Sequence, residues 1–394
     1  MASPHPTLLR LARGDDLPTD LHVATALVDS AAEHGMAPLL DAVVRNHELD
    51  GDHDALVQLT MRSLESAADT RAALEALDSL LDTCDTLGIN IAVFKGLAIG
   101  SRWYPRPELR PACDIDVFVD PEQIDRLGEL VERFATKPGN RAAVEGMVAE
   151  GRVFEYSLVV DRVAVDLHID PMNLVVPTRQ QQLLWEHTEM IPIPNERKIR
   201  TLDLELTIVQ ALLHLFRDNF ADLLHIYDVS LMLDDDPDWH FIEAFIETEG
   251  WTDLVRFSLG FVCDVLERPS PLPRDISTNS RMAISTFWPE RILLKGPESI
   301  IANPHRQSMA SLLIAGRRLD VAGAMTRRVF PSRSVIDDRF EDSTGSYPVA
   351  LYRWRRSQQE EAKRFKSWTL RSSGDTSDTP PESTTRAGAN DEAI

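Results

Sequence analysis

Residues 91–120 read IAVFKGLAIGSRWYPRPELRPACDIDVFVD, and this stretch decides the fold. It opens with the apolar character of a buried strand, which breaks at Lys95-Gly96 and is followed by a turn-rich segment. The chain returns as a second apolar strand that carries Asp114 and Asp116. Because strand side chains alternate between faces, both carboxylates project from one face. Folding alone does not explain two carboxylates there, so we predict a functional site.

Two adjacent carboxylates repel each other, and burying them unpaired costs on the order of several kcal/mol. A divalent cation removes this cost, and Mg²⁺ is typically held by one or two carboxylates together with substrate phosphates. Asp166, in the alternating run VAVDLHID, offers a third carboxylate of the kind that a two-metal site needs. The alternative interpretation is a solvated strand end in an acidic protein.

The remaining patterns predict an α/β fold, more loosely α+β, with a small mixed sheet. Residues 17–87 have helical apolar spacing that ends at Gly88, and residues 154–160 and 163–169 predict a hairpin with its turn at Asp161-Arg162. We expect four parts: an N-terminal helical segment (1–87), a core that bears the acidic residues (88–200), a large helical domain with a basic C-terminal segment (201–371), and a disordered tail (372–394).

Composition limits the function classes. The formal net charge of the 394-residue chain is −22, which opposes broad attraction to nucleic acid or to an anionic membrane. The three cysteines form no CxxC pair, so neither a disulfide framework nor a cysteine zinc site is indicated. No signal-peptide core and no run of about 18 apolar residues is present, and we expect a cytoplasmic protein without membrane contact.

The order of these motifs resembles the polymerase-β-like nucleotidyltransferase superfamily, and it is most similar to a branch of largely uncharacterised prokaryotic nucleotidyltransferases. The resemblance covers about residues 87–356, including RRVFPSRSVIDDRF and YRWRR near its end. It rests on a strand followed by Lys95-Gly96 and a helix, then on Tyr104-Pro105, Leu109-Arg110-Pro111, Asp114-Ile115-Asp116 and Val165-Asp166-Leu167-His168.

The resemblance implies a Mg²⁺-dependent enzyme that transfers a nucleoside monophosphate from an NTP, such as ATP, to an acceptor and releases pyrophosphate. By the same resemblance, Asp114 and Asp116 hold two Mg²⁺ ions. Asp166 completes the metal site and positions or deprotonates the attacking hydroxyl. Such chemistry depends mainly on positioning and charge neutralisation. The sequence names neither the acceptor nor the base of the NTP.

Two segments compete for the phosphate-binding turn. The superfamily usually opens its helix with Gly-Ser or Gly-Gly, whereas Lys95-Gly96 follows the strand here and Gly100-Ser101 lies a turn later. We favour Lys95-Gly96, because helix N-termini attract anions, and keep Ser101 as the second candidate. Arg110 is either a further phosphate contact or an ion-pair partner of the aspartates.

Polar residues outside this stretch are weaker signals. His168 shares the face of Asp166 by strand alternation, although a lone histidine is more often a hydrogen-bonded core residue. In the helical half, His214 and Asp218 are four residues apart, and Asp228 follows His225 by three. A metal fragment is one interpretation of these residues, and buried ties between helices are the one we favour.

Two other functions remain open. A non-catalytic nucleotide-binding or regulatory protein would keep the fold without needing Asp166. A toxin or tRNA-modifying nucleotidyltransferase would need RNA contacts. The basic, aromatic residues 352–371 are the local patch that fits RNA, although a docked surface helix is the alternative.

Overall fold

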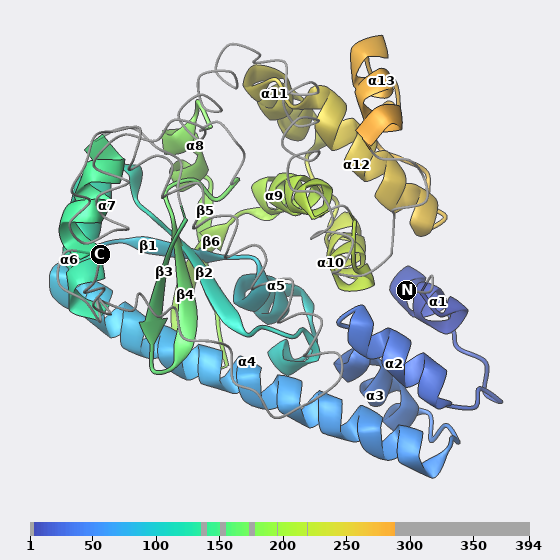
Figure 1. Cartoon of the computed structure of the whole chain (residues 1–394). Coiled ribbons are helices and arrows are strands. Elements are labelled where there is room, and N and C mark those ends of the chain that lie inside the picture. The colour runs from blue at the N-terminus through green and yellow to red at the C-terminus, as the bar shows by residue number, and fades with distance from the viewer. Residues whose placement is uncertain are drawn as a thin grey trace, which may run out of the picture.

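The computed structural model describes residues 4–134, 140–149, 155–172, 178–194, 196–218 and 220–287. The basic segment, the predicted tail and the C-terminal part of the expected helical domain lie outside these residues. Helices, one small mixed sheet and a separate two-stranded sheet make up the described part, so the predicted fold class is confirmed (Figure 1). Within that part, no helix combines the length and the apolar character that crossing a membrane requires.

In the described residues, helices precede the sheet, and the longest of them is α4. Its 35 residues run from α2 and α3 at one end to the sheet and α6 at the other, and it ends at Gly88, whose φ of 63° suits a glycine (Figure 1). The predicted stop at Gly88 is therefore confirmed. The helices before the sheet are α1 (Pro6–Arg13), α2 (Thr25–Glu33), α3 (Ala37–Asn46) and α4 (His53–Leu87).

The main sheet has the order β1-β2-β4-β3. β2 is antiparallel to β1 and parallel to β4, while β3 and β4 are antiparallel. Its strands are β1 (Ile91–Phe94), β2 (Asp114–Val119), β3 (Glu155–Val160) and β4 (Val163–His168). The connections hold α5 (Gly96–Trp103), the 3₁₀ helices η1 (Pro107–Leu109) and η2 (Pro121–Arg126), α6 (Leu127–Phe134) and α7 (Asn140–Ala149).

The predicted hairpin is confirmed as β3 and β4. Its turn residues Asp161 and Arg162 have φ values of 48° and 74°. Two consecutive residues with positive φ produce the backbone twist that a two-residue hairpin turn needs. The parallel pairing of β4 with β2 then carries Asp166 to the strand that bears the other two aspartates.

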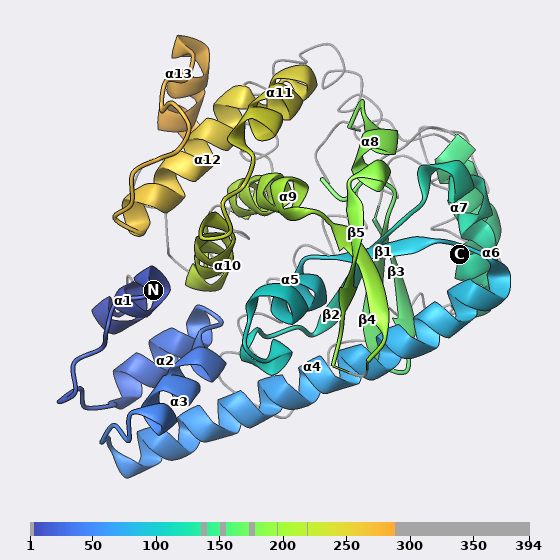
Figure 2. The same cartoon turned by 180° about the vertical axis from the view of Figure 1, so that it is seen from behind.

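A second hairpin and a set of helices complete the described chain. β5 and β6 pair with each other, and β6 lies beside β1 (Figure 2). The elements are α8 (Gln181–Glu186), β5 (Thr188–Pro192), β6 (Lys198–Leu202), α9 (Leu204–Arg217), α10 (Leu223–Leu233), α11 (Trp239–Glu249), α12 (Thr252–Val265) and α13 (Thr278–Phe287).

The two faces of the sheet belong to different hydrophobic cores. Ile115, Val117 and Val165 project toward α4 and α6, where Leu80 is one of the side chains that bury them. On the opposite face, Phe118 joins the core built by the other helices. The aspartates project from this second face, so they lie on the side of the sheet that the C-terminal helices approach.

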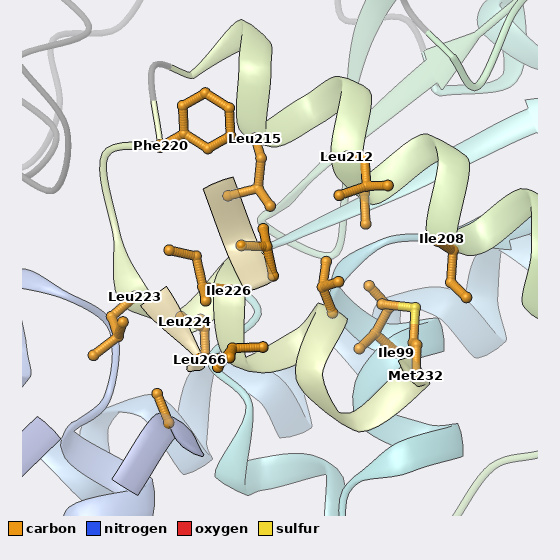
Figure 3. Packing of buried hydrophobic residues seen from close by; sticks show 14 of the residues in the cluster. Ile99, Ile208, Leu212, Leu215, Phe220, Leu223, Leu224, Ile226, Met232 and Leu266 are labelled. Carbon is orange, nitrogen blue, oxygen red and sulfur yellow. The ribbon is translucent and has the colours of Figure 1, made fainter. Parts of the chain in front are cut away.

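Helix α5 connects the sheet to those helices. Its residue Ile99 is 2% exposed and lies close to Ile208 of α9 and Met232 of α10 (Figure 3). Burial of an aliphatic side chain of this size contributes about 1.5–3 kcal/mol. The start of α5, directly after β1, is thereby held in a fixed position beside the acidic strand.

Candidate active site

The register of β2 and β4 brings the three aspartates together. Asp116 lies directly opposite Asp166, and Asp114 lies two residues before Asp116 on the same face. Asp116 is 8% exposed, whereas Asp114 and Asp166 are half-buried. A solvated strand end does not describe a buried carboxylate of this kind.

Asp116 is held by two donors through a single oxygen. Lys95 donates to Oδ1 over 2.6 Å, and His168 Nε2 lies 2.8 Å from the same atom. Both partners are buried, with His168 at 0% exposure. Burial opposes ionisation of Asp116, but the hydrogen bond from His168 and the charge of Lys95 outweigh it and lower the pKa of Asp116.

The two flanking aspartates are less well compensated. Burial, reinforced by the charge of Asp116, raises the pKa of Asp114. Burial is also the main cause of the raised pKa of Asp166, and together with the charges of Glu155 and Asp116 it outweighs the 2.6 Å hydrogen bond that Ser157 donates to Asp166. Negative charge therefore accumulates beside Asp116, which is the condition that a bound cation relieves.

Lys95 occupies an unusual backbone conformation. Its φ is 54° and its ψ is −135°, a combination that a glycine would adopt at little cost. The residue directly follows β1 and is the N-cap of α5, and its Nζ also lies 5.0 Å from the centre of the Phe94 ring. Gly96 is therefore the first residue of α5, where backbone N–H groups have no acceptor within the helix.

The two glycines of α5 allow Arg110 to pass close to the helix. A Cβ at Gly96 would lie 3.3 Å from Arg110 Nη1, and a Cβ at Gly100 would lie 3.3 Å from the Pro107 carbonyl oxygen and 3.4 Å from Arg110 Cβ. Close packing thus accounts for both glycines without a phosphate. Ser101 lies inside α5, and its Oγ is buried with no hydrogen-bond partner among the described residues.

Arg110 forms an ion pair with a residue that sequence analysis assigned elsewhere. Its Nη2 and Nε donate to Asp228 of α10 over 2.8 and 3.1 Å, and the Tyr104 hydroxyl donates to Asp228 over 2.7 Å. All three side chains are buried. Arg110 is thus an ion-pair partner, but of Asp228 and not of the strand aspartates, and a phosphate contact by Arg110 stays a prediction.

His214 and His225 of the helical half pair with carboxylates at the ends of their own helices. His214 Nδ1 lies 2.8 Å from Asp218, and His225 Nδ1 lies 2.9 Å from Asp222. His225 is therefore paired with Asp222, which precedes it, and Asp228 serves Arg110 instead. The two imidazole rings lie 4.8 Å apart between α9 and α10, as buried ties between helices would.

The donor set of the acidic strand suits Mg²⁺, which prefers carboxylate oxygens. No group of three His, Cys, Asp or Glu side chains in the part of the chain that the structure describes is arranged to hold a metal ion by itself. The carboxylates therefore form no closed cage, and phosphate oxygens would have to supply further ligands. Their role as metal ligands stays a prediction.

Sequence reasoning missed Ser157, and it missed the contact between Tyr104 and Asp228, which it had noted for other reasons. Ser157 lies opposite Asp166 on β3, and a register count along the predicted hairpin would have found it. Tyr104 and Asp228 meet only because α10 folds onto α5, and no sequence spacing signals a contact across 124 residues.

Comparison with known proteins identifies the relationship. A family model described as "Uncharacterised nucleotidyltransferase" matches residues 23–267. The chain belongs to this family. The matched region of this nucleotidyltransferase starts before the expected residue 87 and includes α2, α3 and the helices α9 to α12. It ends before residue 356, so the expected resemblance of the later segment is untested. A search of curated proteins finds no match to the chain.

Proposed function

We propose that this family member is a metal-dependent nucleotidyltransferase that moves a nucleoside monophosphate from an NTP to an unidentified acceptor. One observation carries the proposal: Asp114, Asp116 and Asp166 share one face of two parallel strands in register, within the region that the nucleotidyltransferase family model matches. We further propose that the fold is related to the polymerase-β-like superfamily.

In this proposal the three aspartates hold Mg²⁺ together with the triphosphate. The bound ions neutralise charge on the phosphates and favour displacement of pyrophosphate from the α-phosphorus. We assign Asp166 as the residue that positions or deprotonates the attacking hydroxyl. The hydrogen bond from Ser157 fixes the Oδ1 atom of Asp166 and so orients its carboxylate. The raised pKa values of Asp114 and Asp166 support their assignment as metal ligands, since a cation would lower both.

The start of α5 is the proposed phosphate-binding turn. Lys95-Gly96 lies at the junction of β1 and the helix N-terminus, where N–H groups and the helix dipole favour an anion. Gly100-Ser101 lies within the helix, with its hydroxyl buried, and is the weaker candidate. Lys95, Gly96 and the nucleotide would thus lie next to the acidic strand.

A second candidate function is nucleotide binding without transfer activity. The ion pair between Asp116 and Lys95 favours it. The charge of Asp116 is already compensated by Lys95, and a catalytic metal ligand is expected to face a metal instead. RNA as acceptor is a third, less favoured possibility, because the basic segment that suggests it lies outside the described residues.

The test is transfer of label from each of four α-³²P-labelled NTPs, with Mg²⁺ and with or without cell lysate. Asp114→Asn and Asp166→Asn are the informative variants, because neither side chain forms an ion pair in the described structure. Asp125→Asn, an exposed aspartate on η2, is the matched control. The proposal requires label transfer by wild type and Asp125→Asn but not by the other two.

The outcomes separate the candidates. Label on RNA, on a protein or on a small molecule in the lysate identifies the acceptor class. Retained transfer in Asp166→Asn would contradict the assigned chemistry. No transfer by any protein, with NTP binding that Asp166→Asn leaves unchanged, would establish the binding-only alternative.

A further inference from the structure

The ion pair between Lys95 and Asp116 lies inside the candidate metal site. The two side chains are 10% and 9% exposed, and their charged atoms are 2.6 Å apart. A buried pair of this kind gains little over apolar packing, because both charges lose their hydration. Its presence on the acidic strand therefore calls for an explanation beyond stability.

The backbone at Lys95 supports this view. Positive φ with ψ near −135° disfavours every residue that has a Cβ, and glycine would remove the strain. The chain instead places a lysine there and directs its ammonium group at Asp116. We infer that this position needs the lysine side chain and its positive charge, and that this need outweighs the backbone strain.

The geometry leaves room for a second cation at the same carboxylate. Lys95 and His168 both occupy Oδ1 of Asp116, and no described residue hydrogen-bonds its Oδ2. Asp114 and Asp166 lie on either side, and no basic side chain within the described residues pairs with them. A cation held by these carboxylates would lie within a few ångströms of the Lys95 ammonium, and two cations at that distance repel strongly.

We propose that Lys95 is a resident counter-ion of Asp116 that a divalent cation displaces. This inference rests on the proposed function. The long side chain of Lys95 starts at the N-cap of α5, so the released ammonium remains beside the turn where the triphosphate is expected. Lys95 would thereby couple metal entry to phosphate binding. Before the metal enters, Lys95 is paired with Asp116, and afterwards Lys95 is paired with the triphosphate.

The first experiment measures Mn²⁺ binding without nucleotide, by the electron paramagnetic resonance signal of free Mn²⁺. Lys95→Gln keeps a hydrogen-bond donor and removes the competing charge, so we expect it to bind Mn²⁺ at least about tenfold more tightly than wild type. Lys198→Gln, an exposed lysine on β6, should bind like wild type. Unchanged or weaker binding by Lys95→Gln, or no Mn²⁺ binding by any of the proteins at millimolar concentrations, would overturn the proposal.

The second experiment needs no variant. In ¹⁵N-lysine-labelled wild type, the Lys95 ammonium group should exchange slowly with water because it is buried and paired, and saturating Mg²⁺ should abolish that protection. Persistence of the protected signal in saturating Mg²⁺ would contradict displacement, even if Lys95→Gln fails to fold. Neither experiment measures transfer, so displacement without any transfer would overturn the proposed function alone.

Discussion

Residue by residue, the aspartates of the acidic strand have different environments. Asp116 gains two buried partners, which lower its pKa. Asp114 and Asp166 have raised pKa values, because burial and like charges disfavour their ionised forms. Folding thus favours the ionised form of Asp116 and disfavours the ionised forms of the other two.

This difference predicts opposite effects of the same substitution. Asp116→Asn leaves the Lys95 ammonium group buried without a counter-ion, and we expect a loss on the order of 3 kcal/mol in the free energy of unfolding. Asp166→Asn removes repulsion by Glu155 and Asp116, and we expect unchanged or higher stability. Urea unfolding of the metal-free proteins measures both. Equal destabilisation by the two variants would contradict this account.

Among the elements, α5 combines the most constraints. It follows the strained Lys95, packs Ile99 against α9 and α10, and allows Arg110 to pass beside its glycines (Figure 3). The apolar pattern of residues 91–120 predicted the strands on either side of this helix, and the family resemblance predicted the helix itself. The packing of Arg110 was not, because a glycine in a helix is equally consistent with a phosphate or with a side chain nearby.

The close approach predicts an unusual response to alanine. Replacing a helical glycine by alanine normally stabilises a helix by up to about 1 kcal/mol. We expect that gain for Gly146→Ala in α7, where an added Cβ would meet nothing within 4 Å. Gly100→Ala should show no gain or a loss, because of the tight contacts to Pro107 and Arg110. Thermal unfolding tests this, and an equal gain at both sites would contradict it.

The Arg110–Asp228 pair connects the segment before β2 to α10. Arg110→Met should destabilise the protein by about 3–5 kcal/mol, since Asp228 then remains buried and unpaired. The double variant with Asp228→Leu should lose less than the sum of the single losses. Arg268→Met, which breaks an exposed pair with Asp234, should cost less than about 1 kcal/mol. Additive effects at Arg110 and Asp228 would contradict the pairing.

At the scale of the whole molecule, buried histidines contribute to the contact between distant parts of the chain. His34 of the N-terminal helices is 1% exposed, and its carbonyl oxygen accepts a hydrogen bond from the Leu224 amide of α10. Burial lowers the pKa of His34, and it lowers the pKa of His214 to about 4. His225 differs, because Asp222 raises its pKa against the effect of burial.

These shifts predict weaker folding in acid. His34 and His214 take up protons more readily when unfolded, so the stability they confer is complete above pH 6.5 and is lost as the pH falls below it, through a pKa of about 4 in the case of His214. His225 acts in the opposite direction, because its contribution is present below 6.5 and is lost as the pH rises through its raised pKa. His34 and His214 both destabilise the folded state in acid, and the pKa of His214 is lowered to about 4, so we expect them to outweigh His225. The melting temperature should therefore fall from pH 7 to pH 5.

Substitution identifies the responsible groups. His214→Asn should flatten the dependence of the melting temperature on pH between 7 and 5, and His34→Asn should do the same. His47→Asn, at an exposed position after α3, should leave it unchanged. A melting temperature that does not decrease in acid would contradict the assignment.

Much of the candidate site was open to sequence reasoning. The alternation in β2 and β4 predicted that Asp114 and Asp116 share a face, and the hairpin prediction brought Asp166 into the same sheet. The partners of Asp116 were less accessible: His168 was recognised on the correct face, but Lys95 was assigned to phosphate. The local sequence pattern shows which face of a strand a side chain occupies but not which atom it contacts. For Lys95 that contact depends on the backbone conformation of the residue itself, which has a φ of 54°.

By itself, the sequence determined the helices and strands and which of their faces are apolar. Glycine marks where a helix ends, and apolar residues alternate with polar ones along the strands. The same alternation places the aspartates together on one face of the sheet. These properties follow from near-neighbour sterics and periodicity. Only the tertiary structure decided that Asp116 meets Lys95 and His168, that Arg110 meets Asp228, and that the glycines of α5 contact Arg110. Those contacts join residues far apart in the chain, and their geometry depends on how sheet and helices pack after each has formed.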